Sequence, residues 1–176
     1  MTTVLVRSRR LATILGLVTT TLGVAGCSLD GNATLPPFSD PATQTYDAST
    51  GVVIANMTRV SQHLYTQDLV EGTGRTVTTG DSISVFYSGR LASGFRFDAL
   101  SSPSPPFATV ISDSTPLIRG WIGGLPGAKV GGTRRLVIGP ALGYQYSPQR
   151  DQNNRVVIPS NSVLVFDVQI VSANPR

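Results

Sequence analysis

Residues 162–171, SVLVFDVQIV, carry an apolar side chain at every second position, and this pattern constrains the fold more than any other feature of the chain. Successive side chains of a strand point to opposite faces of a sheet, so the alternation indicates a strand with one buried face. Residues 81–91, DSISVFYSGRL, repeat the pattern, with serines on the opposite face. Residues 133–140, TRRLVIGP, and residues 64–69 indicate two further strands.

Only residues 120–130, GWIGGLPGAKV, favour a helix, and their glycines predict a short one. The stretches EGTG and TTGD are typical of turns between strands, and the 18 glycines and 12 prolines suit a turn-rich chain. Residues 52–54 could form one more short strand. The pattern therefore predicts an α+β fold in which a twisted antiparallel sheet packs against one short helix.

The first 26 residues have the order of parts found in an export signal. Arginines in VRSRR precede the apolar run LATILGLVTTTLGV, which then leads through VAG into Cys27. This order resembles the bacterial lipobox, which implies that Cys27 is lipidated and becomes the first mature residue. An ordinary signal peptide with an incidental cysteine is the alternative. A transmembrane anchor is weaker, because three consecutive threonines interrupt the run.

The composition divides the chain into three parts. Residues 1–26 form the predicted signal peptide. Residues 27–57 begin with the lipidated cysteine and continue as a polar stretch without apolar periodicity, which predicts a flexible tether. Residues 58–176 form the predicted globular domain.

Charge and residue types exclude several functions. The formal charge of +4 falls to +1 once the three arginines of the predicted signal are removed, and no basic stripe for nucleic acid remains. One cysteine and one histidine, His63, cannot form a zinc site, and the sequence lacks a nucleophile elbow and a phosphate loop. An enzyme of this composition is expected to work without a nucleophile, a metal or a cofactor.

The order of the motifs resembles the FKBP-type peptidyl-prolyl cis-trans isomerase domain. The resemblance runs from about residue 64 to residue 171 through DLVEGTG, GDSISVFYSGRLASGFRFDAL, PFATV, PLIRGWIGGLPGAKVGGTRRLVIGPALGYQY and VIPSNSVLVFDVQI. It implies a half-open antiparallel sheet wrapped around one short helix. It also implies catalysis of rotation about the bond preceding proline, with no cofactor.

The resemblance assigns site residues one by one. The positions that match the catalytic set of the family are Tyr87, Phe97, Asp98, Trp121, Tyr144 and Phe166. The positions that match its substrate-binding wall are Phe107, Leu117, Ile118 and Ile158. On this assignment Trp121 forms the base of the pocket, with the neighbouring glycines letting it lie under a proline ring. The Tyr144 hydroxyl reaches a ligand carbonyl.

Three stretches depart from the family pattern, and one of them is the segment from Phe107 to Trp121, which is one residue longer than usual. The sequence FDAL stands in place of FDSS, and the loop after it lacks the basic residue that often pairs with the aspartate. The polar stretch QYSPQRDQNNRVV replaces a compact loop, and Gln145 stands where glycine commonly comes after the tyrosine. The resemblance implies that the loop after Tyr144 overhangs the pocket, so its change bears on substrate preference and on macrolide affinity.

These observations are compatible with three functions. The first is an isomerase in the bacterial cell envelope that acts on proline-containing exported clients and also takes macrolide inhibitors. The second is a non-catalytic chaperone or peptide-binding lipoprotein, and the third is a structural lipoprotein with a vestigial pocket. A membrane partner is expected through the lipid, and Ser28 after the cysteine favours the outer membrane by resemblance to other lipoproteins.

Overall fold

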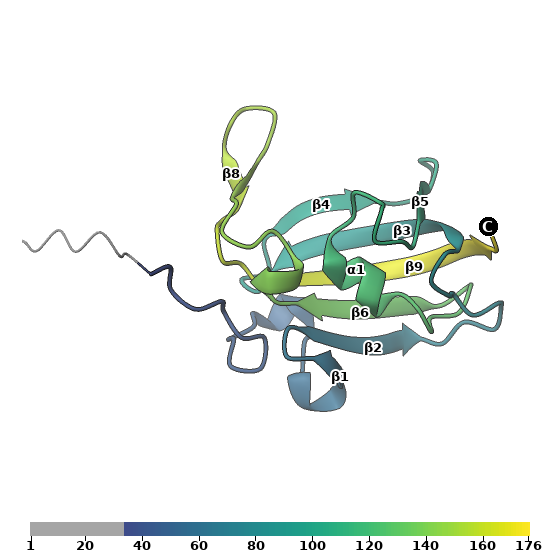
Figure 1. Ribbon diagram of the computed structural model, residues 1–176, viewed down its shortest axis with the longest axis horizontal. Helices are drawn as coiled ribbons and strands as arrows, with labels where there is room; N and C mark the ends of the chain where they lie inside the picture. The colour runs from purple at the N-terminus through teal and green to yellow at the C-terminus, as the bar shows by residue number, and fades with distance from the viewer. Residues whose placement is uncertain (1–33) are drawn as a thin grey trace, which may run out of the picture. The chain divides into compact units, whose positions relative to one another are not determined.

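One antiparallel sheet of seven strands organises the part of the chain that the structure describes, residues 34–176 of a computed structural model (Figure 1). Along the sheet the strands follow the order β1-β2-β6-β9-β3-β4, and β5 also pairs with β3. The two short strands β7 and β8 form a separate hairpin. The strands are β1 (Thr58–Ser61), β2 (Leu64–Val70), β3 (Ser82–Leu91), β4 (Arg96–Leu100), β5 (Phe107–Val110), β6 (Thr133–Ile138), β7 (Gln149–Arg150), β8 (Val156–Ile158) and β9 (Leu164–Asn174).

The helical elements are few and short. They are the α-helix α1 (Arg119–Gly124) and the 3₁₀ turns η1 (Ala48–Thr50), η2 (Ile54–Asn56) and η3 (Pro140–Leu142). Within residues 34–176, no helix combines the length and hydropathy of a membrane-spanning segment. The predicted signal peptide and Cys27 lie outside the described residues.

The alternating sequences predict β3 and β9 as strands with one buried face each, and in the structure these two long strands pair with each other. Val85 of β3 and Val168 of β9 are fully buried, and the polar residues between such positions point to the other face. The predicted fold class is therefore confirmed: one antiparallel sheet packs against one short helix.

Glycines bring α1 close to the sheet. A Cβ on Gly120 would lie 2.5 Å from Ile138 of β6, and one on Gly124 would lie 2.8 Å from Leu136 of the same strand. Both distances are far shorter than side-chain contacts allow, so these positions require glycine for close packing. We expected the glycines that neighbour Trp121 to leave room beneath a bound ligand. This prediction is wrong for Gly120 and Gly124. They make room for β6.

The segment before β1 packs against the domain, which corrects the prediction of a flexible tether up to residue 57. The compact unit begins at Pro36 rather than at residue 58. Thr50 is only 1% exposed, and the backbone N–H of Asp47 donates to the carbonyl of Ala92 over 2.8 Å. The predicted strand at residues 52–54 is also wrong, because a 3₁₀ turn begins at Ile54.

This segment packs on a second hydrophobic cluster, which lies on the sheet face opposite α1. Its buried members alternate along the strands with residues of the main core. They are Met57, Tyr65, Val137, Val163 and Val165, against which Tyr46, Val52 and Ile54 pack. The apolar residues of the segment are spaced irregularly among polar ones, so no periodicity marked them as part of a core.

Candidate active site

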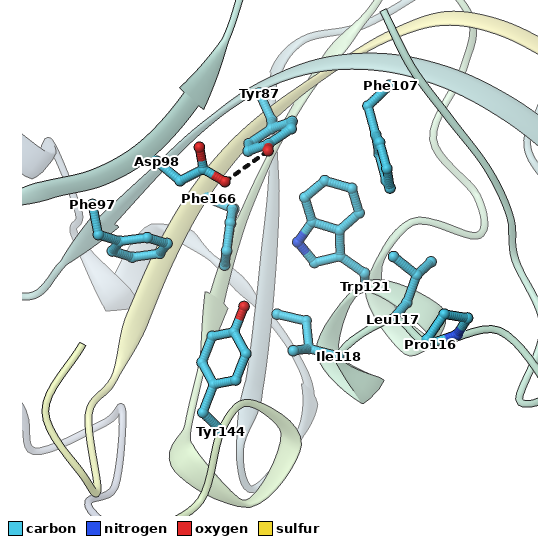
Figure 2. A pocket seen from close by; sticks show the side chains of 10 residues that line it. All are labelled: Tyr87, Phe97, Asp98, Phe107, Pro116, Leu117, Ile118, Trp121, Tyr144 and Phe166. Carbon is cyan, nitrogen blue, oxygen red and sulfur yellow. Dashed lines mark hydrogen bonds between the residues drawn. The ribbon is translucent and has the colours of Figure 1, made fainter. Parts of the chain in front are cut away.

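A pocket of about 190 Å³ opens beside the start of α1 (Figure 2). Drug-sized ligands occupy pockets of roughly 300–1,000 Å³, so this volume suits a single small ring. Its walls come from the four strands β3, β4, β5 and β9, from α1 and from the loops beside them. The lining residues are Tyr87, Phe97, Asp98, Phe107, Pro116, Leu117, Ile118, Trp121, Tyr144 and Phe166.

Trp121 forms the base of the pocket and is 4% exposed. Its indole meets Phe166 edge to face with ring centroids 5.4 Å apart at 89°, and meets Tyr87 at 5.4 Å and 80°. In this arrangement the partly positive edge of one ring lies against the partly negative face of the other, which is a favourable contact. The indole nitrogen is buried and has no hydrogen-bond partner among the described residues. The base of the pocket is therefore rigid and mostly apolar.

Gly89 makes room for a second aromatic pair and was not predicted as a site residue. It lies on β3 opposite Asp98 on one side and Phe166 on the other. A Cβ at this position would lie 2.7 Å from the ring of Phe97 and 2.8 Å from the ring of Phe166. The absence of a side chain thus lets these two rings meet edge to face at 5.5 Å. A glycine inside a strongly alternating strand was the available signal.

A hydrogen bond closes the polar side of the pocket. The Tyr87 hydroxyl donates to the Asp98 carboxylate over 2.7 Å, so a tyrosine holds the aspartate that lacks its expected basic partner (Figure 2). Burial, and then this bond, raise the pKa of Tyr87. Burial, and then the charge of Asp98, raise the pKa of Tyr144. Both hydroxyls therefore stay protonated at neutral pH. That of Tyr144 points into the pocket (Figure 2) and has no hydrogen-bond partner within residues 34–176.

The structure brings together nine of the ten site residues that the sequence predicted. The exception is Ile158, which is 3% exposed and lines an adjoining groove instead. Pro116 lines the pocket but was not predicted, although it directly precedes Leu117 in the motif PLIRGW. No group of three or more metal-ligating side chains occurs within residues 34–176.

The adjoining groove is formed by the polar stretch that replaces a compact loop. That stretch folds into the β7–β8 hairpin, which projects from one end of the sheet (Figure 1). The groove, of about 550 Å³, shares Phe97, Asp98 and Tyr144 with the pocket and has Val157 and Ile158 among its apolar residues. Its polar residues come from the hairpin, namely Gln149, Arg150, Asp151, Gln152 and Asn153.

Gln145 has a backbone conformation that favours glycine. Its φ of 54° lies in the left-handed region, which disfavours residues with a Cβ by about 1–2 kcal/mol. Its backbone N–H donates to the carbonyl of Pro140 over 2.9 Å, and its carbonyl accepts from the N–H of Asn161 over 2.7 Å. These two bonds hold the turn that comes after Tyr144.

Comparison with known proteins agrees with this architecture. Residues 73–171 match the sequence model of the family described as FKBP-type peptidyl-prolyl cis-trans isomerase. FK506-binding protein 4 of Chaetomium thermophilum is 42% identical over 115 residues, which are 64% of this chain and 22% of that protein. A probable FKBP-type peptidyl-prolyl cis-trans isomerase of Haemophilus influenzae is 35% identical over 105 residues, 60% of this chain and 40% of that one. The chain thus spans less than half the length of either relative.

Solved structures show the same fold. The crystal structure of FkpA from Escherichia coli has a TM-score of 0.56 at 32% identity, with 68% of this chain and 52% of that chain covered. A peptidyl-prolyl cis-trans isomerase from Pseudomonas syringae has a TM-score of 0.57 at 25% identity, with 68% and 81% covered. The family match extends over more than half of the chain and includes all the residues that line the pocket. The chain belongs to the FKBP-type peptidyl-prolyl cis-trans isomerase family.

Proposed function

We propose that this protein is a peptidyl-prolyl cis-trans isomerase that acts on proline-containing polypeptides in the cell envelope. The observation that carries the proposal is the convergence of side chains from distant parts of the sequence on one small aromatic pocket with a free hydroxyl at its edge. The pocket has the volume for a single ring, and membership of the family supports the reaction.

The pocket chemistry suits bond rotation. The planar amide before proline has partial double-bond character, and rotation meets a barrier of about 18–20 kcal/mol. The twisted amide has lost its resonance, so its carbonyl is less polar than in the planar form. An apolar cavity penalises the planar form more than the twisted one, which lowers the barrier by differential binding. No covalent intermediate is needed.

Several contributions are required for a large rate enhancement. Lowering the barrier by about 7 kcal/mol gives on the order of 10⁵ in rate. A hydrogen bond from Tyr144 supplies about 0.5–1.5 kcal/mol of this. The rest is assigned to water exclusion and to the fixed ring geometry of Trp121, Phe97 and Phe166, because rigid packing favours one shape of the bound chain.

The test is an isomerisation assay on a short Xaa-Pro peptide with wild-type protein and the Phe97→Ala variant. The wild-type protein is expected to accelerate isomerisation well above the uncatalysed rate. The variant, which loses one wall of the pocket, is expected to lose most of that acceleration while keeping its circular dichroism spectrum. A folded wild-type protein without acceleration refutes the proposal.

A non-catalytic peptide-binding or chaperone role is the second candidate, and the groove beside the pocket favours it. The groove offers a larger surface, lined by both polar and apolar residues, for chain residues that flank the proline. An assay that measures how far the protein suppresses the aggregation of an unfolded client separates the two functions. Suppression that survives Phe97→Ala, in a protein with no measurable isomerisation, supports the chaperone role.

We further propose that a lipid on Cys27 anchors the protein to a membrane of the envelope, with the outer membrane favoured. The support is the order of arginines, apolar run and cysteine at residues 1–27. One acyl chain gives only marginal binding, so the anchor requires the several chains of a bacterial lipoprotein. The Cys27→Ser variant is expected to move from the membrane fraction to the soluble fraction, and unchanged membrane association refutes the anchor.

A further inference from the structure

Residues 36–39, here called the docked segment, contact the loop that carries Tyr144. The ring of Phe38 stacks on the ring of Tyr146 with centroids 4.7 Å apart and an angle of 20° between the planes. The Tyr146 hydroxyl donates to the carbonyl of Pro36. The docked segment lies at the end of the sheet from which the β7–β8 hairpin projects (Figure 1). It thus reaches a residue only two positions from the pocket tyrosine.

Asn161 joins the docked segment to the same loop by a second route. Its side-chain oxygen accepts from the N–H of Ser39 over 2.9 Å, and its amide nitrogen donates to the carbonyl of Pro37 over 3.3 Å. Its own backbone N–H donates to the carbonyl of Gln145 over 2.7 Å. The docked segment therefore contacts both Tyr146 and the residue that holds Gln145.

The backbone conformation of Gln145 depends on these contacts. A residue in the left-handed region persists only where its surroundings determine its geometry. Gln145 lies between Tyr144, which lines the pocket, and Tyr146, which contacts the docked segment. Loss of the contacts to Tyr146 and Asn161 would leave the turn free to relax, and the Tyr144 ring would move with it.

We propose that the docked segment positions Tyr144 in the pocket, with Phe38, Tyr146 and Asn161 as positioning residues. This inference rests on the proposed isomerase function. A hydrogen bond to the bound chain requires the Tyr144 hydroxyl to be held within about 0.5 Å of its productive place. A segment with the composition of a linker thus becomes part of the support of the site.

The test compares variants of the full chain in an isomerisation assay. Phe38→Ala is expected to lower kcat/KM by about 2- to 10-fold, within the range that one hydrogen bond supplies. Phe38→Tyr, which keeps the stacked ring, is expected to restore it. Asn161→Gly is expected to act like Phe38→Ala, because glycine accepts the φ of 59° at this position while the bonds to Ser39 and Pro37 are lost. Val53→Ala, at a 54% exposed position away from the pocket, is the control.

A double-mutant cycle shows whether the effect passes through Tyr144. In the Tyr144→Phe background, Phe38→Ala is expected to change kcat/KM by less than about twofold, because the hydroxyl that it positions is already absent. An unchanged kcat/KM in Phe38→Ala, or an equal loss in both backgrounds, overturns the inference.

Two readouts separate this inference from the isomerase proposal. Hydrogen exchange at the amides of Gln145 and Ser147, both hydrogen-bonded within the loop, is expected to accelerate in Phe38→Ala. The affinity for a proline peptide is expected to fall in the same variant. A wild-type protein that binds the peptide without isomerising it refutes the isomerase proposal alone, and unchanged exchange and affinity in Phe38→Ala refute the positioning role alone.

Discussion

At the scale of single residues, the pocket depends on one donor and several tightly fitted rings. The Tyr87 hydroxyl is hydrogen-bonded to Asp98, so Tyr144 supplies the hydroxyl that can donate to a ligand. The pKa of Tyr144 is raised by burial and by the charge of Asp98, so the hydroxyl remains a donor throughout the neutral range. The chemistry of the site thus concentrates in a residue of a loop, on a scaffold of rigid strands.

Tyr144→Phe tests this role. We expect kcat/KM to fall about 2- to 12-fold, which corresponds to one hydrogen bond of about 0.5–1.5 kcal/mol, while the stability of the fold changes little. Tyr65→Phe is a matched control, because that tyrosine is buried in the cluster on the opposite face of the sheet. Equal activity of the two variants contradicts the assignment.

At the scale of elements, periodicity in the sequence predicted only some of the strands that frame the site, namely β3 and β9, whereas β4 and β5 were not predicted. The alternation predicted β3 and β9 as strands, although not their pairing, and the stretch GWIGGLPGAKV predicted a short helix. Nine of the ten predicted site residues line the pocket because they belong to motifs shared by the family. The roles of Gly89 and of the docked segment were not predicted, because both depend on contacts between residues far apart in the sequence.

The glycines of α1 provide a matched pair of tests. Gly120→Ala is expected to destabilise the protein by about 1–3 kcal/mol, since its Cβ would lie 2.5 Å from Ile138. Gly123→Ala is expected to be neutral or stabilising by up to about 1 kcal/mol, because its Cβ would lie at an ordinary 3.4 Å from Leu64 and alanine favours helix. Urea unfolding measures both, and an equal effect of the two substitutions contradicts the packing described.

We expect Asp81, in the connection between β2 and β3, to make the stability of the folded protein depend on pH. Asp81 accepts hydrogen bonds from Arg75 and from the backbone N–H of Thr78, and these bonds lower its pKa from 3.8 to about 2. A pKa that is lower in the folded state contributes stability above about pH 4, and this contribution is lost as the pH falls toward about 2. Urea unfolding of wild type and Asp81→Asn from about pH 6 to about pH 2 measures it. The difference between them is expected to shrink below about pH 4, and a constant difference contradicts the assignment.

At the scale of the whole molecule, the packed segment before β1 shortens the link to the proposed lipid. An extended residue spans at most about 3.3–3.6 Å, so the stretch from Cys27 to Pro36 reaches about 30 Å. The tether predicted from composition, ending at residue 57, would reach about 100 Å. An anchored protein of this form would hold its pocket near the membrane surface and act on chains that pass close to it.

Removal of the packed segment tests whether it belongs to the fold. A fragment of residues 58–176 lacks Tyr46, Val52 and Ile54, which cover the cluster on the second face of the sheet. We expect it to be less stable than residues 36–176 by about 2–5 kcal/mol, given about 1.5–3 kcal/mol for each fully buried large side chain. Thermal unfolding compares the two fragments. Equal midpoints would show that the segment is a tether after all.

We propose that the aromatic pocket itself catalyses rotation about the bond before proline. The most direct measurement is nuclear magnetic resonance exchange between the cis and trans signals of an Xaa-Pro peptide at equilibrium, with the Trp121 indole signal followed in the same samples. We expect catalytic amounts of protein to accelerate the exchange, and saturating peptide to shift the indole signal. Exchange at the uncatalysed rate in the presence of folded protein, or acceleration without any change at Trp121, would contradict this proposal.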